Sequence, residues 1–422
     1  MTPTLGEATR EWARIGVLSF GGPAAQIALM HRILVDERRW LTERQFLDAL
    51  SFCMLLPGPE AMQLATYAGW RLHGVMGGLI AGVLFVLPGA LTVLALAAVY
   101  AFYGNMPLVE ALFLGVKAAV LVIVVEALLR VAKRALLRPL HWAIAAAAFG
   151  AIFFLALPYP LVIACAALAG AMAGDGGQGE AAPPLAVTPM RTAGTVATWL
   201  AVWILPLAML EWVMPGHVLG EIGWFFSVLA TVTFGGAYAV LAFMAQDAVS
   251  AYGWLTAGEM MDGLGLAETT PGPLILVTEF VGFLAAARDG GGISLGSGLA
   301  GAAVTLWATF APCFLWIFAG APYIDWIGTR PRLRAALSGI TAAVVGVILN
   351  LSLWFALHVG FGQVAQQKAG PFTLSVPDVS TIDWRVPVIA GIAAFLLLRC
   401  HKGVALTLGV SAGLGLLSKF FQ

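Results

Sequence analysis

The sequence predicts an all-α polytopic membrane protein made of two homologous halves in inverted topology, with re-entrant or broken helices at its FGG and PGP motifs. Three observations lead to this prediction: the apolar composition, an internal repeat, and a reversal of charge between the two copies. Of the 422 residues, 60% are hydrophobic and 10% are charged, and the mean hydropathy is +0.92. Because soluble domains carry about 25% charged residues, we expect the chain to lie in a lipid bilayer.

Several apolar runs approach the roughly 20 residues that a membrane-spanning helix requires, among them 75–103, 107–129, 195–214 and 335–357. The N-terminal residues lack a basic stretch followed by an apolar core, so no cleaved signal is expected. We therefore expect a multi-pass protein of the cell inner membrane. The net charge of zero argues against a nucleic-acid partner, and the four scattered cysteines predict no disulfide, metal site or cofactor.

The repeat appears when the sequence is shifted by 214 residues, which aligns 20–59 with 234–273 without a gap and makes 15 of 40 positions identical. Both copies contain an FGG motif, then WLT, then PGP. The second copy has an insertion near 288–297, after which the offset is 224 and Pro88 aligns with Pro312. Chance does not produce such a pattern.

The repeat defines the expected domains. They are an N-terminal transporter half at 1–173, a Gly/Pro-rich linker at 174–194, a connecting transmembrane helix at 195–214, and a C-terminal half at 215–422.

Basic residues indicate the orientation of each half, because cytoplasmic loops carry an excess of Lys and Arg. Segment 31–44 holds four arginines, whereas its counterpart 245–258 holds no basic residue. The bias reverses further along, where loop 102–110 has no basic residue and its counterpart 326–334 has three arginines. The two halves are therefore expected to lie upside down relative to each other, an arrangement typical of secondary transporters.

The FGG and PGP motifs predict breaks within membrane helices. Segment 15–30 lies between basic flanks and would span only about 24 Å as a helix, short of a roughly 30 Å bilayer core. We expect it, and segment 45–70, to enter and return, with short helices opening after Pro23 and Pro59. Free N–H groups at such helix N-termini can bind an anion. The alternative is a kinked spanning helix whose glycines allow close helix packing.

Ionisable residues within the apolar runs are costly and therefore point to function. Lys117 lies ten residues into its run and could balance a dianion; the alternative is a structural ion pair, for example with Glu110. Glu60 follows the first PGP motif directly and is either a helix cap or a proton carrier. Asp48 and Asp262 occupy matching positions in the two copies, which favours a shared structural role.

Other polar residues surround the PGP motifs. Glu268 and Glu279 flank the second motif and are further candidates for proton coupling. Gln63 and Tyr67 share one face of the helix that follows Pro59. They could donate hydrogen bonds to oxyanion oxygens, although polar contacts between helices would explain them equally well.

The stretches FGGPAAQIALMHR and LLPGPEAMQLATYAGW closely resemble the chromate ion transporter family in its long, two-domain form, as do FGGAYAVLAFMAQDAV and TTPGPLILVTEFVGF in the second half. The resemblance covers nearly the whole chain. It implies secondary transport of chromate, usually efflux from the cytoplasm that confers chromate resistance, by halves of opposite orientation. The chromate substrate is implied by this resemblance alone.

The predicted function is thus chromate export with the anion held near the membrane midplane and no catalytic residue. The residues expected to bind the anion are Phe20, Gly21, Gly22, Pro23, Pro57, Gly58, Pro59, Gln63, Tyr67, Lys117, Phe234, Gly235, Gly236, Pro271, Gly272 and Pro273. The proton-coupling candidates are Glu60, Asp48, Asp262, Glu268 and Glu279. The expected partners are chromate or a similar tetrahedral oxyanion and the lipid bilayer, and the chain could form a homodimer. Transport of sulfate or another oxyanion is the alternative, and an intramembrane enzyme is a remote one.

Overall fold

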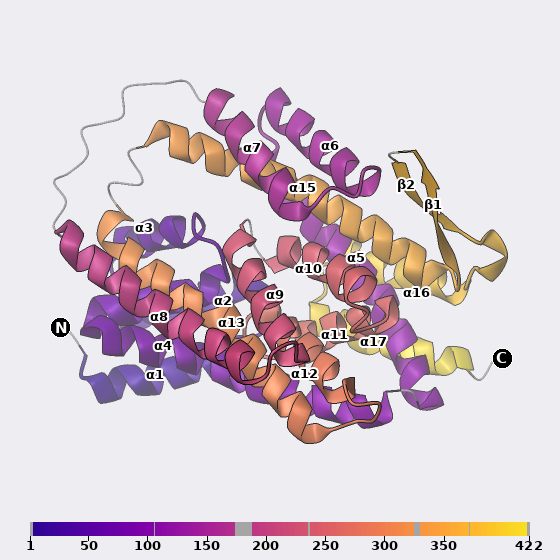
Figure 1. Cartoon of the computed structure of the whole chain (residues 1–422), viewed down its shortest axis with the longest axis horizontal. Coiled ribbons are helices and arrows are strands. Elements are labelled where there is room, and N and C mark those ends of the chain that lie inside the picture. Colours follow the sequence, from indigo (N-terminus) through magenta and orange to yellow (C-terminus); the bar gives the residue numbers. More distant parts are fainter. Residues whose placement is uncertain are drawn as a thin grey trace. The chain divides into compact units, whose positions relative to one another are not determined.

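The structure is a computed structural model that describes residues 3–104, 106–173, 188–234, 237–324, 330–370 and 372–419. These residues fold almost entirely into helices (Figure 1). Five helices among the described residues are long and apolar enough to cross a membrane: Glu60–Tyr103, Pro107–Ala135, Pro189–Val213, Leu295–Tyr323 and Pro331–Gly360. The prediction of an all-α polytopic membrane protein is confirmed.

The chain forms two compact units, and each takes segments from both halves of the sequence. The first unit comprises Met1–Ala101, Gly177–Ala237 and Thr270–Pro331. The second comprises Phe102–Gly176, Tyr238–Thr269 and Arg332–Gln422. All four FGG and PGP motifs belong to the first unit.

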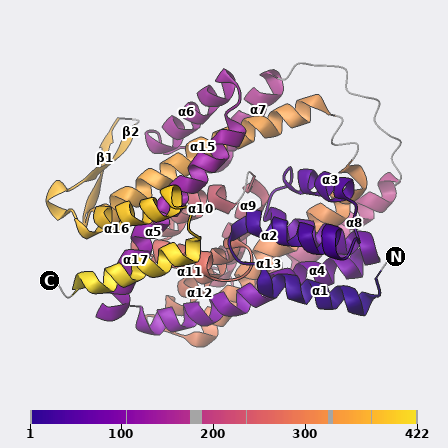
Figure 2. The same ribbon diagram turned by 180° about the vertical axis from the view of Figure 1, so that it is seen from behind.

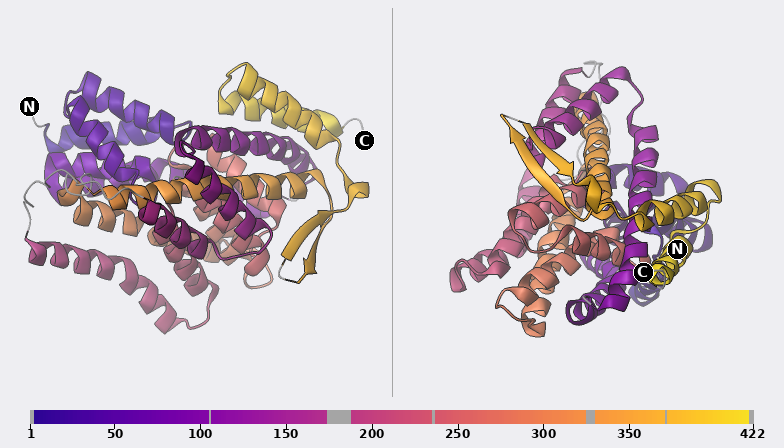
Figure 3. Two further views of the ribbon diagram at one scale, coloured as in Figure 1. Left: turned by 90° about the horizontal axis from the view of Figure 1, so that it is seen from above. Right: turned by 90° about the vertical axis from the view of Figure 1, so that its right-hand side faces the viewer.

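The first unit is a bundle in which α13 packs against α8, α9 and α12 (Figure 3). Helix α8 begins at Pro189, six residues before the connecting helix expected from the sequence. The elements of this unit are α1 (Leu5–Leu18), α2 (Gly22–His31), η1 (Arg32–Glu37), α3 (Glu43–Cys53), α4 (Glu60–Tyr103), α8 (Pro189–Val213), α9 (Val218–Val232), η3 (Leu274–Leu276), α12 (Val277–Arg288), α13 (Leu295–Gly320) and η4 (Ala321–Tyr323).

Helix α4 is a hairpin of two helices. His73 and Gly74 leave the helical conformation, and Gly74 has φ +62°. The helices on either side touch through glycines, because a Cβ on Gly69 would lie 2.3 Å from the carbonyl oxygen of Gly77. The first of these helices starts directly after the first PGP motif, so close packing holds that motif in place.

The second unit is organised around α5, against which α11, α16 and α17 pack (Figure 2). A Cβ on Gly115 would lie 1.8 Å from the carbonyl oxygen of Ser411, so the backbones of α5 and α17 are in direct contact. The elements are α5 (Pro107–Ala135), α6 (Pro139–Phe153), α7 (Tyr159–Ala173), α10 (Ala237–Gln246), η2 (Asp247–Ala251), α11 (Ala257–Thr269), α15 (Pro331–Gly360), β1 (Val364–Ala369), β2 (Phe372–Pro377), η5 (Val379–Thr381), α16 (Arg385–Ala394), η6 (Phe395–Arg399) and α17 (Val404–Ser418).

The hairpin of β1 and β2 is a feature that the sequence analysis did not predict. The strands pair antiparallel from Val364 with Pro377 to Ala369 with Phe372. Gly370 has φ +62° in the turn, a conformation that glycine adopts without steric cost. Each strand has six residues, and the alternation of apolar and polar residues in FTLSV was the available sign of β2.

The repeat in the sequence is also a repeat of local structure. At the offset of 214, α1, α2, η1 and α3 correspond to α9, α10, η2 and α11, and at 224 α5 corresponds to α15. Even the capping agrees: Thr42 and Gln45 cap α3 reciprocally, and Thr256 and Glu259 make the same two bonds at α11. The inverted orientation of the halves in the membrane stays a prediction.

Candidate functional site

The first FGG motif separates α1 from α2. Gly21 and Gly22 have φ values of +86° and +78°, which only glycine adopts readily. Pro23 lies in the first turn of α2, where a backbone N–H has no partner within the helix, so the N–H that proline lacks costs no hydrogen bond. Among the described residues no side chain caps this helix end, and a Cβ on Gly22 would meet no atom within 4 Å. Phe20 beside it is 51% exposed. The first turn of α2 therefore has N–H groups that are accessible to a ligand.

The first PGP motif lies between α3 and α4 and is buried. Gly58 has φ +113°, and a Cβ there would lie 2.9 Å from Nε2 of Gln63 and 3.1 Å from Sγ of Cys313. Glu60 is the first residue of α4 and is half-buried. A carboxylate at this position interacts favourably with the helix dipole. The motif is thus a tightly packed chain reversal at the start of a helix.

One backbone hydrogen bond joins each PGP motif to the residue before the FGG motif of the other half. The N–H of Gly58 donates to the carbonyl oxygen of Thr233 over 2.8 Å, and the N–H of Gly272 donates to that of Ser19 over 2.7 Å. Gly58 aligns with Gly272 and Ser19 with Thr233, so the two bonds are equivalent under the repeat. The two PGP motifs and the residues that precede the two FGG motifs are therefore joined in two matching junctions within the first unit.

The second-half motifs are described in part. Phe234 is half-buried, while Gly235 and Gly236 lie outside the described residues. In the second PGP motif Pro271 is half-buried and Pro273 is buried. Gly272 between them has φ +90°, and its missing side chain leaves room for Gly89, whose Cα would lie 3.2 Å from an added Cβ.

Two fully buried glutamines reach back over these junctions. Nε2 of Gln63 donates to the carbonyl oxygen of Pro57 over 2.6 Å. Nε2 of Gln26 donates to the carbonyl oxygen of Gly272 over 2.6 Å and to that of Ser19 over 3.3 Å. A carbonyl can only accept, which fixes the orientation of both amides. Among the described residues neither Oε1 has a hydrogen-bond partner.

Gln26 is a residue that the sequence analysis missed. The available signal was an amide side chain inside the otherwise apolar α2, four residues after an FGG motif. A buried amide requires partners, and those partners are the carbonyl groups that the junction exposes. The amides of Gln26 and Gln63 thus satisfy carbonyl oxygens that would otherwise repel an anion.

Lys117 and Asp262 form an ion pair in the second unit. Nζ of Lys117 lies 3.3 Å from Oδ2 of Asp262, and the side chains are 22% and 5% exposed. The partner of Lys117 is therefore on another helix and is not Glu110, which the sequence analysis considered. Asp48, at the matching position in the first half, is 55% exposed and pairs with Arg44 one turn earlier.

The remaining predicted residues have contrasting surroundings. Glu268 is 9% exposed and accepts a hydrogen bond of 2.7 Å from the hydroxyl of Tyr238. Glu279 is fully buried, and neither carboxyl oxygen has a hydrogen-bond partner among the described residues. Tyr67 is buried with its ring 5.8 Å from that of Trp70. Of these, Glu279 is the carboxyl group whose surroundings least support a charge.

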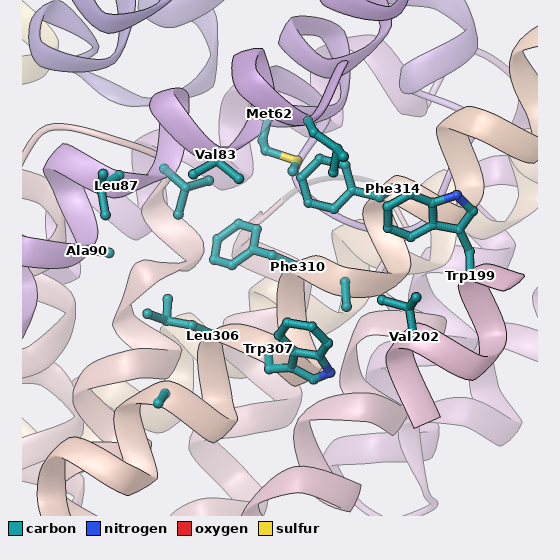
Figure 4. A pocket seen from close by; sticks show the side chains of 15 residues that line it. Met62, Val83, Leu87, Ala90, Trp199, Val202, Leu306, Trp307, Phe310 and Phe314 are labelled. Atoms are coloured by element: carbon teal, nitrogen blue, oxygen red, sulfur yellow. The ribbon is translucent and has the colours of Figure 1, made fainter. Parts of the chain in front are cut away.

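A cavity of about 510 Å³ lies between α4, α8 and α13 in the first unit. Its lining is apolar, and Phe310, Phe314, Trp199 and Trp307 surround it (Figure 4). The donors among these side chains are the indole N–H groups of Trp199 and Trp307, and that of Trp307 already bonds to the carbonyl oxygen of Trp203 over 3.2 Å. The glycine junctions are therefore the better candidate site.

A second cavity, of about 220 Å³, lies in the second unit between the loop after α6, the end of α10 and α15. Its lining includes the polar side chains of Tyr159, Gln246, Asp247 and Asn350. None of these was a predicted site residue, because they come from three separate segments with no shared spacing.

Comparison with known proteins identifies the family. The family model described as chromate transporter matches residues 6–171 and 220–416. The chain is 36% identical over 374 residues to the chromate transport protein of Pseudomonas aeruginosa, covering 86% of this chain and 82% of that one. It is 33% identical over 350 residues to the chromate transport protein of Cupriavidus metallidurans, covering 82% and 81%.

A probable chromate transport protein of Synechococcus elongatus is 30% identical over 349 residues, covering 82% of this chain and 83% of the relative. No solved structure matches the chain. The relatives are named as transporters and not as enzymes, and the resemblance noted in the sequence is confirmed. The chain belongs to the chromate transporter family.

Proposed function

We propose that this protein is a secondary transporter that exports chromate from the cytoplasm across the inner membrane. The anion is held by backbone N–H groups at the FGG and PGP junctions, near the membrane midplane. The donors come from 21–23, 58–60, 235–237 and 272–274. Proline has no N–H, and the N–H groups of Gly58 and Gly272 already donate to Thr233 and Ser19. The bonds therefore come from the FGG glycines and from the first residues of each following helix.

The pair of equivalent backbone bonds at Gly58 and Gly272 is the observation that supports this proposal most directly. Each bond joins one half of the sequence to the other at a broken helix. Irregular backbone is tolerated within a membrane only where it is buried or lines a wet cavity. Transporters with inverted repeats place their substrates at such interrupted helices. Backbone donors also suit a substrate that must leave, because they form no permanent ion pair.

The energetics favour outward movement. Moving one charge across 100 mV is worth about 2.3 kcal/mol, so a dianion leaves a cell with a negative interior downhill. Protons add a driving force only if they are exchanged for the anion. The five candidate carboxyl groups for such coupling are those of Glu60, Asp48, Asp262, Glu268 and Glu279, and Lys117 adds a long-range attraction for the anion.

Sulfate is the alternative substrate, because it is also a tetrahedral dianion. Backbone N–H groups bind the outer oxygens and do not distinguish a central sulfur atom from a central chromium atom. The experiment is uptake of labelled chromate by purified protein in liposomes, with and without an imposed membrane potential. We expect uptake of chromate to increase when the liposome interior is positive. Uptake of sulfate with no uptake of chromate would replace the substrate assignment.

A further inference from the structure

The cavity of about 220 Å³ in the second unit is not used by the proposed function. Among its described lining residues Asp247 alone carries a charge, and Gln246 and Asn350 add two amide groups. The stacked rings of Tyr159 and Phe243, with centroids 5.3 Å apart, form part of the wall. The lining is therefore partly polar and carries a single negative charge.

The carboxylate of Asp247 has no counterion within the described chain. The side chain is half-buried, and no ion pair or hydrogen bond from another described residue reaches its carboxylate. Partial burial of an unpaired carboxylate costs free energy, because the group loses water without gaining a partner. A cation in the cavity would supply that partner.

The repeat shows that the fold does not require a charge at this position. At the offset of 214 Asp247 aligns with Ile33, and the two residues lie in the π-helices η2 and η1. Ile33 is fully buried. The second copy thus has a carboxylate beside a cavity where the first copy has a buried aliphatic side chain. Such a departure from an otherwise shared structure indicates a function of the second copy, and π-helical turns are frequent at functional sites.

The neighbouring positions change in the same direction. Gln246 aligns with Arg32, so a neutral amide replaces a cation of the first copy. Asn350 aligns at the offset of 224 with Glu126, whose partner Arg130 has no basic counterpart in the second copy. The side chains that remain offer oxygen atoms and no fixed positive charge.

We propose that this cavity binds an alkali metal cation, held by the carboxylate of Asp247 and the amide oxygens of Gln246 and Asn350. Hard cations prefer oxygen ligands of these kinds. The volume of about 220 Å³ leaves room for waters beside the ion, and these complete its coordination shell.

The charge of the lining selects among possible occupants. One carboxylate balances one positive charge, whereas a divalent ion would keep a charge without compensation. The described residues contain no group of three or more His, Cys, Asp or Glu side chains suited to a metal ion, which agrees with a singly charged occupant. An oxyanion would be repelled by Asp247. The cavity is therefore a different kind of site from the one proposed for chromate, and the inference goes beyond the proposed function.

The test measures the melting temperature of the purified protein at constant ionic strength, with NaCl, KCl or methylammonium chloride replacing N-methyl-D-glucamine chloride. A ligand that binds only the folded state stabilises it further as its concentration increases. We expect Na⁺ or K⁺ to raise the melting temperature by about 2 °C or more over about a hundredfold range of concentration.

Variants assign this response to the cavity. Asp247→Asn should lose the response, and without alkali cations it should be at least as stable as the wild type, because no unpaired carboxylate remains. Asp247→Ile copies the residue of the first copy and supplies the same measurement if Asp247→Asn does not fold. Asn350→Leu keeps the charge but removes one oxygen ligand, so it should need more cation for the same shift. Asp289→Asn is the control, since it removes an exposed carboxylate and should keep the wild-type response.

Equal melting temperatures of the wild type in all four salts, or an Asp247→Asn variant that keeps the response, would overturn the proposal. A response to methylammonium but to neither alkali cation would also overturn it, because the occupant would then be an organic ammonium group. None of these measurements involves chromate, so the proposed function is tested separately.

Discussion

Replacing Gly22 by alanine tests whether the accessible end of α2 binds the anion. Gly22 has φ +78°, and a Cβ there meets no atom within 4 Å, so the new methyl group clashes with nothing. The folding cost is then only that of holding an L-residue in the left-handed region, about 1–2 kcal/mol. The methyl group would, however, keep a bound oxyanion away from the backbone N–H groups.

The expected loss of transport is larger than the loss of stability. A hydrogen bond to a charged group contributes about 1.5–3 kcal/mol, and about 1.4 kcal/mol corresponds to a factor of ten. Losing one such bond should raise the KM for chromate about 10- to 100-fold. The assay is initial uptake by purified protein in liposomes at equal protein content, with thermal stability measured on the same samples.

Two further variants make the result decisive. Gly74 has φ +62° with no atom within 4 Å of an added Cβ, and it lies at the turn of the α4 hairpin. Gly74 also has ψ −154°, a conformation almost confined to glycine, so Gly74→Ala should lose at least as much stability as Gly22→Ala and keep its transport. Gly22→Asn should recover stability, because asparagine tolerates the left-handed region, but should still transport poorly. If Gly22→Ala and Gly74→Ala lost transport equally, or if Gly22→Asn restored it, the glycine would be needed for backbone conformation alone.

Three other predictions follow from the described contacts. Asp36 and Ser250 are exposed and are aligned by the repeat. Cysteines placed there, in a protein without its native cysteines, should react with an impermeant thiol reagent from opposite sides of the membrane. Labelling from one side would contradict the inverted arrangement. Gln26→Leu removes the amide donor to the buried carbonyl oxygen of Gly272 and one of two donors to that of Ser19, which still accepts from the N–H of Gly272. The variant should be less stable by about 1–3 kcal/mol, measured by thermal unfolding, and an unchanged melting temperature would show that the bonds contribute nothing. Gly115→Ala must separate two backbones in contact and should lower the free energy of unfolding by about 1–3 kcal/mol or more. An added Cβ at Gly150 meets no atom within 4 Å, so Gly150→Ala should unfold at the wild-type temperature or higher. Equal stability of the two variants would refute the packing argument.

Composition and local backbone rules were sufficient for the class of protein and for the position of most elements. An apolar chain with few charges cannot fold as an ordinary soluble domain. Proline and glycine act on their own backbone, so the helix breaks at Gly21 and Gly58 were predictable from short motifs. The repeat offset likewise placed matching elements, since similar sequences share the same local preferences.

Several features of the candidate site were decided by tertiary structure. No local rule joins Gly58 to Thr233 or Gln26 to Gly272, because their bonds link segments more than 170 residues apart. The turn at Gly74 lies between segment 45–70 and the apolar run 75–103, which the sequence already separates at Arg71 and His73. Only the tertiary structure shows that the two helices pack against each other, through Gly69 and Gly77.

The partner of Lys117 illustrates the same limit. Sequence spacing offered Glu110 on the same helix, two turns away, whereas the structure pairs Lys117 with Asp262 across a helix interface. Spacing along a chain determines which residues share one helix face. Which face meets another helix depends on how side chains of many elements pack together, and that is settled only when the whole unit has folded.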